Sequence, residues 1–199
     1  MHNLFYELAR PDDSVIEKLE NFYTAHVNAR INITAIKSRE DFYIKHYLDS
    51  IYIFQKHVFN FKTLIDVGSG GGFPGVVIAI FYPQSHIYLI ESIRKKCLFL
   101  TDAIKKSKIE NITIINDRVE NINNIKGDVI TARAVGPIKN IIKYTLQLSH
   151  DNTKWIIYKG MNIDSEIANS QKLLTKYELK LNIERIDEPF KRTYTVISY

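Results

Sequence analysis

A glycine-rich turn is the strongest chemical signal in this sequence. The apolar run Thr63–Val67 leads directly into Gly68–Gly72, where glycine occupies four of five positions. Glycine lets a backbone approach a ligand closely, and a helix starting just after such a turn adds the positive end of its dipole. The spacing therefore predicts a ligand-binding turn between a buried strand and a helix.

Two classes of cofactor are compatible with this turn. Gly70, Gly72 and Gly75 match the glycine spacing of dinucleotide-binding turns, and Glu91 lies about where a ribose-binding acid would. Asp66, just before the first glycine, is instead typical of methyltransferases, as is a second acidic element, Asp117–Glu120, after a third strand. A dehydrogenase would also need a second catalytic region, for which the helical first 60 residues are a poor candidate. The pattern favours S-adenosylmethionine over a nicotinamide cofactor.

Individual roles follow from the ends of the predicted strands. We expect Asp66, Gly68, Gly70 and Gly72 to form the cofactor turn. Glu91 ends the second strand, so its carboxylate is expected to accept hydrogen bonds from both ribose hydroxyls. The alternative role for Glu91 is capping the helix that follows.

The residues available for catalysis restrict the methyl acceptor. The segment Thr131–Pro137 lacks the Asn/Asp-Pro-Pro-aromatic sequence typical of amine methylation on adenine or cytosine. Cys97 lies within a predicted helix rather than in a catalytic loop, and the six histidines show no metal-binding spacing. An acceptor with an available lone pair, such as guanine N7, fits a site that works by positioning and electrostatics.

The elements that must position these residues alternate between strand and helix, which predicts an α/β fold. It is a Rossmann-like, mostly parallel, doubly wound sheet that ends in an antiparallel pair. The expected strands are 63–67, 86–90, 111–115, 128–131 and 154–158, followed by the pair 178–186 and 193–198. The expected helices are 74–82, 92–107, 137–148 and 163–174.

The first part of the chain contains no predicted strand. Ser14 and Glu17 have the spacing of a capping box for one helix, and Ser38 opens another. The apolar face of the second helix is expected to comprise Tyr47, Ile51, Phe54 and Val58. We therefore divide the chain into an N-terminal helical extension, 1–60, and a methyltransferase domain, 61–199.

Charge and hydropathy indicate a cytoplasmic protein with a polyanionic partner. The net charge is +5, and residues 91–108 hold six basic side chains against Glu91 and Asp102, a local excess of four. A solvated helix face is the alternative reading of that charge. Charged residues near the start argue against a signal peptide, and the longest apolar run, Val76–Tyr82, is too short to cross a membrane.

Several motifs, in order along nearly the whole chain, resemble one family. The residues that carry the resemblance are Asn32–Thr34, His46–Ser50, Ile65–Gly75, Glu91-Ser92, Lys95-Lys96, Arg118–Glu120, Ala132–Ala134 and Lys159-Gly160. The chain is similar to the bacterial small-subunit ribosomal RNA methyltransferase G family, also called glucose-inhibited division protein B. The resemblance implies a class I methyltransferase fold and N7-methylation of one guanine in 16S ribosomal RNA near the decoding centre.

The resemblance also implies roles for particular residues. Gly68 and Phe73 would contact the cofactor, Val119 and Glu120 would flank its adenine, and Arg133 would lie at its methionine end as the catalytic residue. Two positions depart from the family, which commonly has proline at the place of Gly71 and aspartate at that of Glu91. The partner would be 16S ribosomal RNA or the small ribosomal subunit, and we expect a cytoplasmic monomer without metal or membrane. A nicotinamide oxidoreductase, or an RNA-binding factor that holds the cofactor without turnover, is the alternative.

Three further side chains have more than one possible role. His46 and Asp49 lie three residues apart on one helix face, so they can act together. They either contact RNA or cofactor, or form a packed polar pair that joins the extension to the sheet domain. Lys159, after the fifth strand, either holds a phosphate or starts the next helix.

Overall fold

A seven-stranded sheet forms the centre of the computed structural model, which describes residues 3–36 and 38–199. Its strand order is β3-β2-β1-β4-β5-β7-β6. The first five strands in chain order run parallel, and β7 pairs antiparallel with both β5 and β6. The strands are β1 (Thr63–Val67), β2 (His86–Ile90), β3 (Ile112–Ile115), β4 (Val129–Arg133), β5 (Lys154–Lys159), β6 (Lys180–Ile186) and β7 (Arg192–Ser198). The predicted fold class is confirmed.

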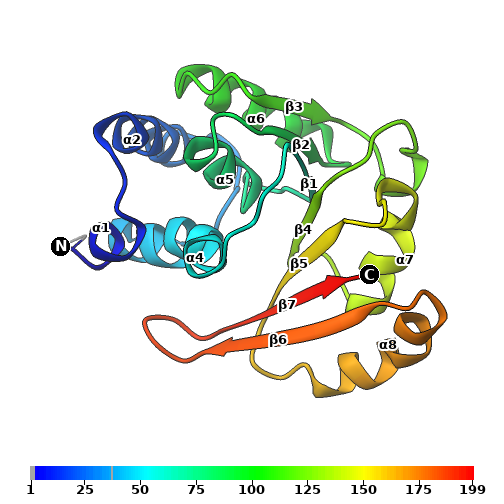
Figure 1. The fold of residues 1–199 in the computed structure, drawn as a ribbon. Helices are drawn as coiled ribbons and strands as arrows, with labels where there is room; N and C mark the ends of the chain where they lie inside the picture. The colour runs from blue at the N-terminus through cyan, green and yellow to red at the C-terminus, as the bar shows by residue number, and fades with distance from the viewer. Residues whose placement is uncertain (1–2, 37) are drawn as a thin grey trace.

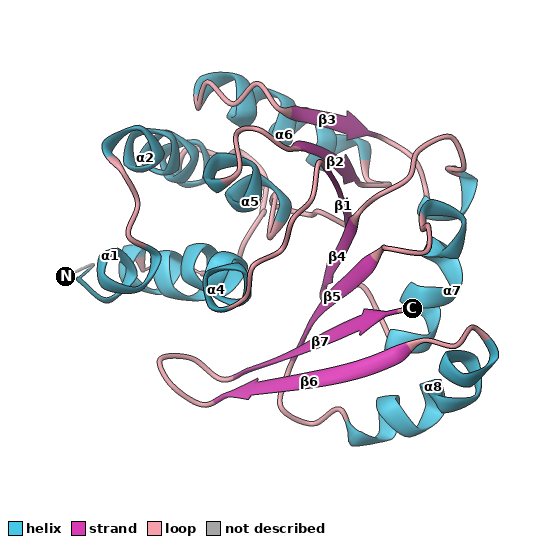
Figure 2. Ribbon diagram, viewed as in Figure 1, coloured by secondary structure: helices cyan, strands magenta, loops and turns pink. Residues whose placement is uncertain are grey.

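Helices cover both faces of this sheet (Figures 1 and 2). One apolar cluster packs α1 (Asn3–Ala9), α2 (Asp13–Val27), α4 (Asp49–Lys56), α5 (Gly75–Phe81) and α6 (Arg94–Lys106) against one face. A second cluster packs α7 (Ile138–Thr145) and α8 (Asp164–Lys176) against the other. The short helical segments are α3 (Arg39–Phe42), the π-helical η1 (Tyr43–Leu48) and the 3-10 turns η2 (Val119–Asn121) and η3 (Leu146–Leu148).

The first apolar cluster is shared by the predicted extension and the predicted sheet domain. Phe5, Leu19 and Tyr47 belong to the same buried group as Leu64 and Ile87. The extension therefore packs as one layer of the molecule, and its helices position residues of η1 beside the sheet. The division at residue 60 stays a prediction.

Two predicted details of the extension are wrong. Helix α2 is capped by Asp12, whose carboxylate accepts from the Val15 N–H, rather than by Ser14. Asp12 precedes the helix directly, so its side chain reaches the free N–H groups of the first turn. Val58 lies beyond the end of α4 and is 86% exposed, because the helix stops at Lys56. The cap at Ser38 is confirmed by its bond from the Asp41 N–H.

Candidate functional site

The carboxyl ends of five parallel strands meet along one edge of the sheet. Strand pairing places Val67 beside Ile90 and beside Ala132, while Arg133 lies beside Tyr158. Since parallel strands end together, the glycine turn after β1, Glu91 after β2 and Arg133 at the end of β4 lie along this edge. In such sheets ligands bind outside the carboxyl ends of the strands.

The glycine turn has a backbone that other residues rarely adopt. Gly68, Gly70 and Gly72 have φ values of +66°, +56° and +94°. The N–H of Gly68 donates to the Ile90 carbonyl at 2.8 Å, which fixes the turn to the end of β2. A Cβ at Gly70 would meet only the Gly68 carbonyl oxygen, at 3.7 Å. The backbone at Gly70 is therefore open to close approach, as the prediction requires.

Gly72 faces the protein interior rather than the open side of the turn. It is buried, and a Cβ there would lie 2.9 Å from Phe22 and 3.0 Å from Leu100. The role of Gly72 in cofactor binding stays a prediction. The missing side chain lets α2 and α6 pack closely against the turn.

Asp66 supports the turn from beneath. It is fully buried, with one carboxylate oxygen accepting from the Thr131 hydroxyl at 2.8 Å and the other from the Gly75 N–H at 3.2 Å. Burial raises the pKa of Asp66 to about 6, while these hydrogen bonds act in the opposite direction. Both oxygens therefore hold the turn against β4 and α5. The role of Asp66 in cofactor binding stays a prediction.

Glu91 also bonds the turn. Its carboxylate accepts from the Gly70 N–H at 2.9 Å and from the Ile93 N–H at 2.8 Å, and the residue is 5% exposed. The second bond lies just before α6, whose N-cap residue is Ile93. Glu91 thus links the glycine turn to the start of α6. It lies at the sheet edge where the ligand is predicted to bind, and by bonding the N-cap residue of α6 it also has part of the predicted capping role.

The second acidic element follows β3 at the same edge of the sheet. Val119 is buried in the 3-10 turn η2, within the apolar cluster that also contains Ile90, whereas Glu120 is exposed. Asn116 donates to the Glu91 carbonyl at 2.9 Å and so ties this segment to the end of β2. The arrangement brings Val119 and Glu120 to the edge where the predicted cofactor residues lie.

Phe73 is buried in an aromatic cluster rather than displayed beside the turn. Its ring stacks on the imidazole of His46, with centroids 4.2 Å apart and planes 7° apart, and it is 5% exposed. Phe22 packs edge-on against it. Both partners of the ring come from the extension. The cofactor contact of Phe73 stays a prediction. Its ring anchors the glycine turn to α2 and η1.

Arg133 lies at the centre of a polar network that joins β4 to η1. Its guanidinium donates to the Asp49 carboxylate and to His46 Nδ1, each at 3.1 Å, and its Cζ lies 5.1 Å from the centre of the Phe73 ring. A guanidinium has no acceptor, so His46 Nδ1 must carry the lone pair. His46 Nε2 then donates to the Thr34 hydroxyl at 2.7 Å.

The environment of His46 keeps its imidazole neutral. Burial lowers its pKa to about 3, and the charges of Arg133, His26 and Arg192 contribute in the same direction. With His46 and Asp49 both bonded to Arg133, the network fixes the guanidinium at the sheet edge. The predicted packed polar pair that joins extension and sheet is present in the structure.

Arg192, at the start of β7, was missed by the sequence analysis. It forms a two-bond fork with Asp49, with Nε–Oδ1 at 2.7 Å and Nη2–Oδ2 at 2.5 Å. The buried Asp49 carboxylate therefore serves two arginines that are far apart in sequence. A single arginine at the head of a strand carries no local signal for such a partner.

Lys159 and Cys97 have internal partners. Lys159 forms an ion pair with Glu166 at 2.6 Å and donates to the Gly136 carbonyl, so it links the end of β5 to α8. The Cys97 thiol is buried and donates to the Glu91 carbonyl at 3.2 Å. Both contacts are structural, although Lys159 also lines a cavity described below.

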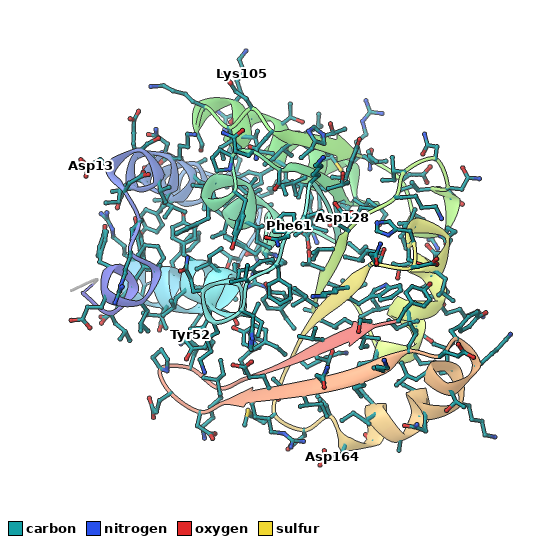
Figure 3. The ribbon with its side chains drawn as sticks, viewed as in Figure 1. Asp13, Tyr52, Phe61, Lys105, Asp128 and Asp164 are labelled. Carbon is teal, nitrogen blue, oxygen red and sulfur yellow. The ribbon has the colours of Figure 1, made fainter. Side chains whose placement is uncertain are left out.

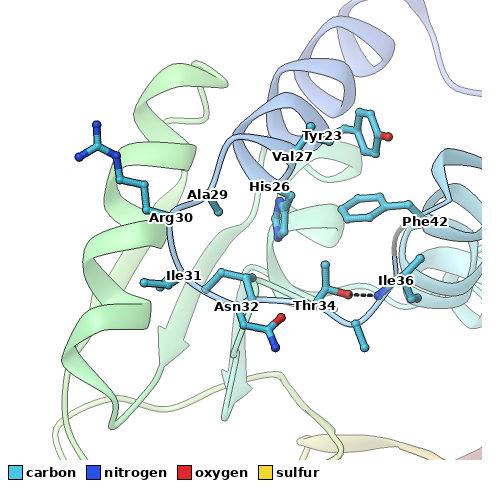
Figure 4. Close-up of a pocket in the computed structure, with 12 residues that line it drawn as sticks. Tyr23, His26, Val27, Ala29, Arg30, Ile31, Asn32, Thr34, Ile36 and Phe42 are labelled. Atoms are coloured by element: carbon cyan, nitrogen blue, oxygen red, sulfur yellow. Dashed lines mark hydrogen bonds between the residues drawn. The ribbon is translucent and has the colours of Figure 1, made fainter.

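A cavity lies beside the glycine turn, on the side of the extension. Figure 4 shows the segment from Arg30 to Ile36 curving past His26 and Phe42. His26 Nε2 lies 2.9 Å from the Gly71 carbonyl oxygen, which places this segment against the turn. A Cβ at Gly71 would lie 2.8 Å from the Ile33 side chain, so the absence of a side chain at Gly71 lets the segment containing Ile33 approach the glycine turn closely.

The fold and this edge of the sheet define a class I methyltransferase, an enzyme that uses an S-adenosylmethionine-type cofactor. Solved structures share the fold. The O-methyltransferase from Bacillus cereus in complex with SAH superimposes with a TM-score of 0.64 and 12% identity over 100% of this chain and 96% of that one. The ribosomal protein L11 methylase from Lactobacillus delbrueckii gives 0.62 and 11% over 81% and 80%.

The chain belongs to the family described as rRNA small subunit methyltransferase G, which matches residues 15–192. The relative of that name from Mesoplasma florum is 36% identical over 86% of this chain and 74% of its own length. The relative from Thermoanaerobacter sp. is 35% identical over 87% and 75%. The predicted family, and with it the enzyme class, is confirmed.

Two observations bear on membranes and metals. Within residues 3–36 and 38–199, no helix has the length and apolar character needed to span a bilayer. The same residues contain no cluster of three or more histidine, cysteine or carboxylate side chains placed to hold a metal ion.

Proposed function

We propose that this protein transfers a methyl group from S-adenosyl-L-methionine to N7 of one guanine in 16S ribosomal RNA near the decoding centre. Family membership supports the reaction class and the RNA substrate. The choice of N7 rests on the hydrogen bonds of His46 and Asp49, the two titratable side chains beside Arg133. His46 is neutral and gives its lone pair to Arg133, and Asp49 is bonded to two arginines. Neither is placed to remove a proton from an acceptor.

The residues at the sheet edge suit an S-adenosylmethionine cofactor. The open backbone at Gly70 supplies a surface that any side chain would fill, beside the partly exposed Gly68. We infer that Gly68, Gly70 and Glu91 hold the cofactor, with Val119 and Glu120 flanking its adenine and Asp66, Gly72 and Phe73 keeping the turn in shape. When bound, the cofactor supplies an electrophilic methyl group.

Arg133 is the proposed catalytic residue, since it ends β4, which lies between β1 with its glycine turn and β5. Its fixed guanidinium orients the groups at the methionine end of the pocket. Guanine N7 has a lone pair and no proton, so the protein's tasks are alignment and exclusion of water. We further propose that the enzyme acts in the cytoplasm as a monomer, on 16S ribosomal RNA or the small subunit.

The direct test is to map N7-methylguanine in 16S ribosomal RNA from cells with and without the gene. One chemical-cleavage site should disappear with the gene and return when purified protein and S-adenosylmethionine are added to the small subunits. A thermal shift with S-adenosylhomocysteine, but none with NAD(H), should accompany it. If the protein binds cofactor and RNA but no cleavage site changes, the chain is an RNA-binding factor without turnover and the proposal is wrong.

The pH dependence of the chemical step gives a second test. With saturating substrates, the single-turnover rate should be nearly flat from about pH 6 to 8.5, since a bell-shaped profile requires an essential acid or base. Arg133→Ala should reduce this rate far more than His46→Asn. A tenfold change that follows one ionisation and disappears in His46→Asn would exclude a bare N7 acceptor.

A further inference from the structure

A second cavity lies beside Arg133, at the carboxyl ends of β4 and β5. Its volume is about 620 Å³, within the range of small-molecule sites. The cavity is lined by the ends of β4 and β5, the π-helical η1, the first residue of α4, the loop residue Ile36, and the turn between β6 and β7. In Figure 1 that turn extends below α4, away from the rest of the sheet. We call the cavity the hairpin pocket.

The hairpin pocket is positively charged. Its lining includes Lys45, Arg133, Lys159, Lys191 and Arg192, against the carboxylate of Asp49. Both arginines already share that one carboxylate, and Lys45 and Lys159 each pair with an acid outside the pocket.

Lys191 stands out among these cations. It is exposed, and no carboxylate of the described part of the chain lies within ion-pairing distance of it. An anionic group that enters the pocket can therefore pair with Lys191 without competition from a carboxylate. A phosphate is such a group, and a lysine ammonium binds it as a point charge.

The same turn of the chain supplies an aromatic surface. Phe190 lines the hairpin pocket and is half-buried, with Tyr52 packed edge-on against it at 5.5 Å and 80°. Tyr52 thus holds the ring from one side. Proteins recognise unstacked RNA bases by stacking them on aromatic rings and binding the adjoining phosphates with basic residues. Phe190 and Lys191 are adjacent in sequence and offer one aromatic ring and one basic group.

Gly160 leaves space in this pocket that the fold does not require. A Cβ built on Gly160 meets no atom within 4 Å, and its backbone lies outside the left-handed region. A Cβ would therefore fit there without strain. Gly160 lines the pocket and is exposed, so its backbone is accessible to a ligand.

We propose that the hairpin pocket binds the target nucleotide of the RNA after it leaves its stack, with the base against Phe190 and a neighbouring phosphate at Lys191. This inference rests on the proposed function, because it names the place of that substrate. Arg133 lines the pocket and also lies over the Phe73 ring of the glycine turn, so the pocket and the turn meet at the catalytic residue. Phe190, Lys191 and Gly160 are thereby assigned to substrate binding.

Three variants test the assignment with small ribosomal subunits as substrate. Gly160→Leu adds a bulky side chain to the pocket lining, Phe190→Leu removes the stacking surface, and Lys191→Ala removes the phosphate partner. For Gly160→Leu and Phe190→Leu we expect kcat/KM to fall about ten- to a hundred-fold, on the scale of one lost base stack. Lys191→Ala should reduce the log–log salt slope of RNA binding by about one, and Lys191→Arg should restore it.

The controls separate this inference from protein stability and from the proposed function. Lys172→Ala removes an exposed lysine of α8 and should change neither kcat/KM nor the salt slope. Binding of S-adenosylhomocysteine and the melting temperature should be unchanged in Gly160→Leu. If the wild-type protein methylates the subunit and both pocket variants match it, the pocket assignment is wrong while the proposed function stands.

A binding measurement that needs no turnover completes the test. Ribosomal RNA with 6-thioguanosine at the target position is irradiated with the protein, and the cross-linked peptide is identified by mass spectrometry. Cross-links to residues 188–192 support the assignment whether or not the methyl group is transferred. Cross-links confined to other parts of the chain overturn it.

Discussion

At the scale of single residues, the polar groups of this site mainly bond one another. Glu91 is the clearest case, since its carboxylate satisfies the N–H of Gly70 and the N–H of Ile93 at the same time. From the sequence, a ribose contact and a helix cap were alternatives for this residue. In the structure the Glu91 carboxylate holds the glycine turn in shape. It therefore also affects a ligand through the position of Gly70.

Glu91→Ala is therefore expected to lower both cofactor affinity and stability. Each hydrogen bond to the carboxylate is worth about 1.5–3 kcal/mol, and the side chain is buried. Urea unfolding and calorimetry with S-adenosylhomocysteine measure the two effects, and Glu110→Ala, at an exposed position, serves as the control. A large loss of affinity with unchanged stability would mean that the carboxylate serves the ligand alone.

His46 makes stability depend on pH. Its pKa is lowered to about 3 in the folded protein, from 6.5 as its ordinary value, so the unfolded chain binds a proton more readily. This contribution to stability is complete above pH 6.5 and is lost as the pH falls below it, by up to about 1.4 kcal/mol for each pH unit.

Comparison with His46→Gln isolates this contribution, because His26 and the carboxylates remain in both proteins. Between pH 7.5 and 5.5, the wild type should lose about 1.4 kcal/mol of unfolding free energy more than the variant. Urea titrations at the two pH values measure the difference. Equal losses would show that His46 keeps an ordinary pKa in the folded protein.

At the scale of elements, the glycine turn depends on its backbone conformation as well as on space. Gly70→Val places a β-branched residue at φ +56°, where an L-residue costs roughly 1–2 kcal/mol, and fills the open side of the turn. We expect a folded protein without measurable binding of S-adenosylmethionine by calorimetry. Gly70→Asn tolerates that φ, so it should lose affinity with less loss of stability. Normal binding by folded Gly70→Val would refute the assignment of the turn.

How much of this was visible in the sequence differs between elements. The bounds of β1 and β2 agree with the predicted 63–67 and 86–90, because a continuous apolar run ending in a turn signal has few other structures. The π-helical η1 was predicted as part of an ordinary helix, since both have similar apolar spacing. The insertion of β7 between β5 and β6 was not predicted, because alternation shows which face of a strand is buried and not which strand is its neighbour.

The candidate site shows the same limit. The glycine turn, Glu91 and Arg133 carry local signals, and the strand register brings them to one edge. The partnership of Asp49 with Arg192 spans 143 positions and has no local signature. The packing of Phe73 and Gly72 against the extension was not predicted, because nothing in the turn itself reveals that the extension covers them.

At the scale of the whole molecule, part of the positive charge of the basic segment 91–108 is paired with acidic side chains. Lys106 pairs with Asp102 at 2.7 Å and Lys108 with Glu17 at 3.0 Å, while Lys105 points outward from α6 (Figure 3). Exposed pairs of this kind contribute little to stability, so both lysines remain available to a stronger anion. The segment stays a candidate for contact with RNA outside the hairpin pocket.

The salt dependence of RNA binding tests this surface. If the segment supplies about three phosphate contacts, the log–log slope should be near −2 to −3, and Lys105→Glu with Lys106→Glu should flatten it. Lys172→Glu with Lys176→Glu, on α8 at the other face of the sheet, is the matched charge reversal and should have little effect. An unchanged slope in the first pair would place the RNA elsewhere, across Arg133, Lys139 and Lys159.

The shared carboxylate of Asp49 also sets an order of events during synthesis of the chain. Asp49 is made early, and Arg192, with which it forms the two-bond fork, follows 143 positions later. At the usual rate of about 5–20 residues per second, the delay is on the order of ten seconds. Until Arg192 is made, the buried carboxylate lacks its fork and has only the contact with Arg133, and burying a charge whose partners are incomplete is costly. We therefore expect the N-terminal helices to reach their final packing around Asp49 only after β7 has been made, late in translation.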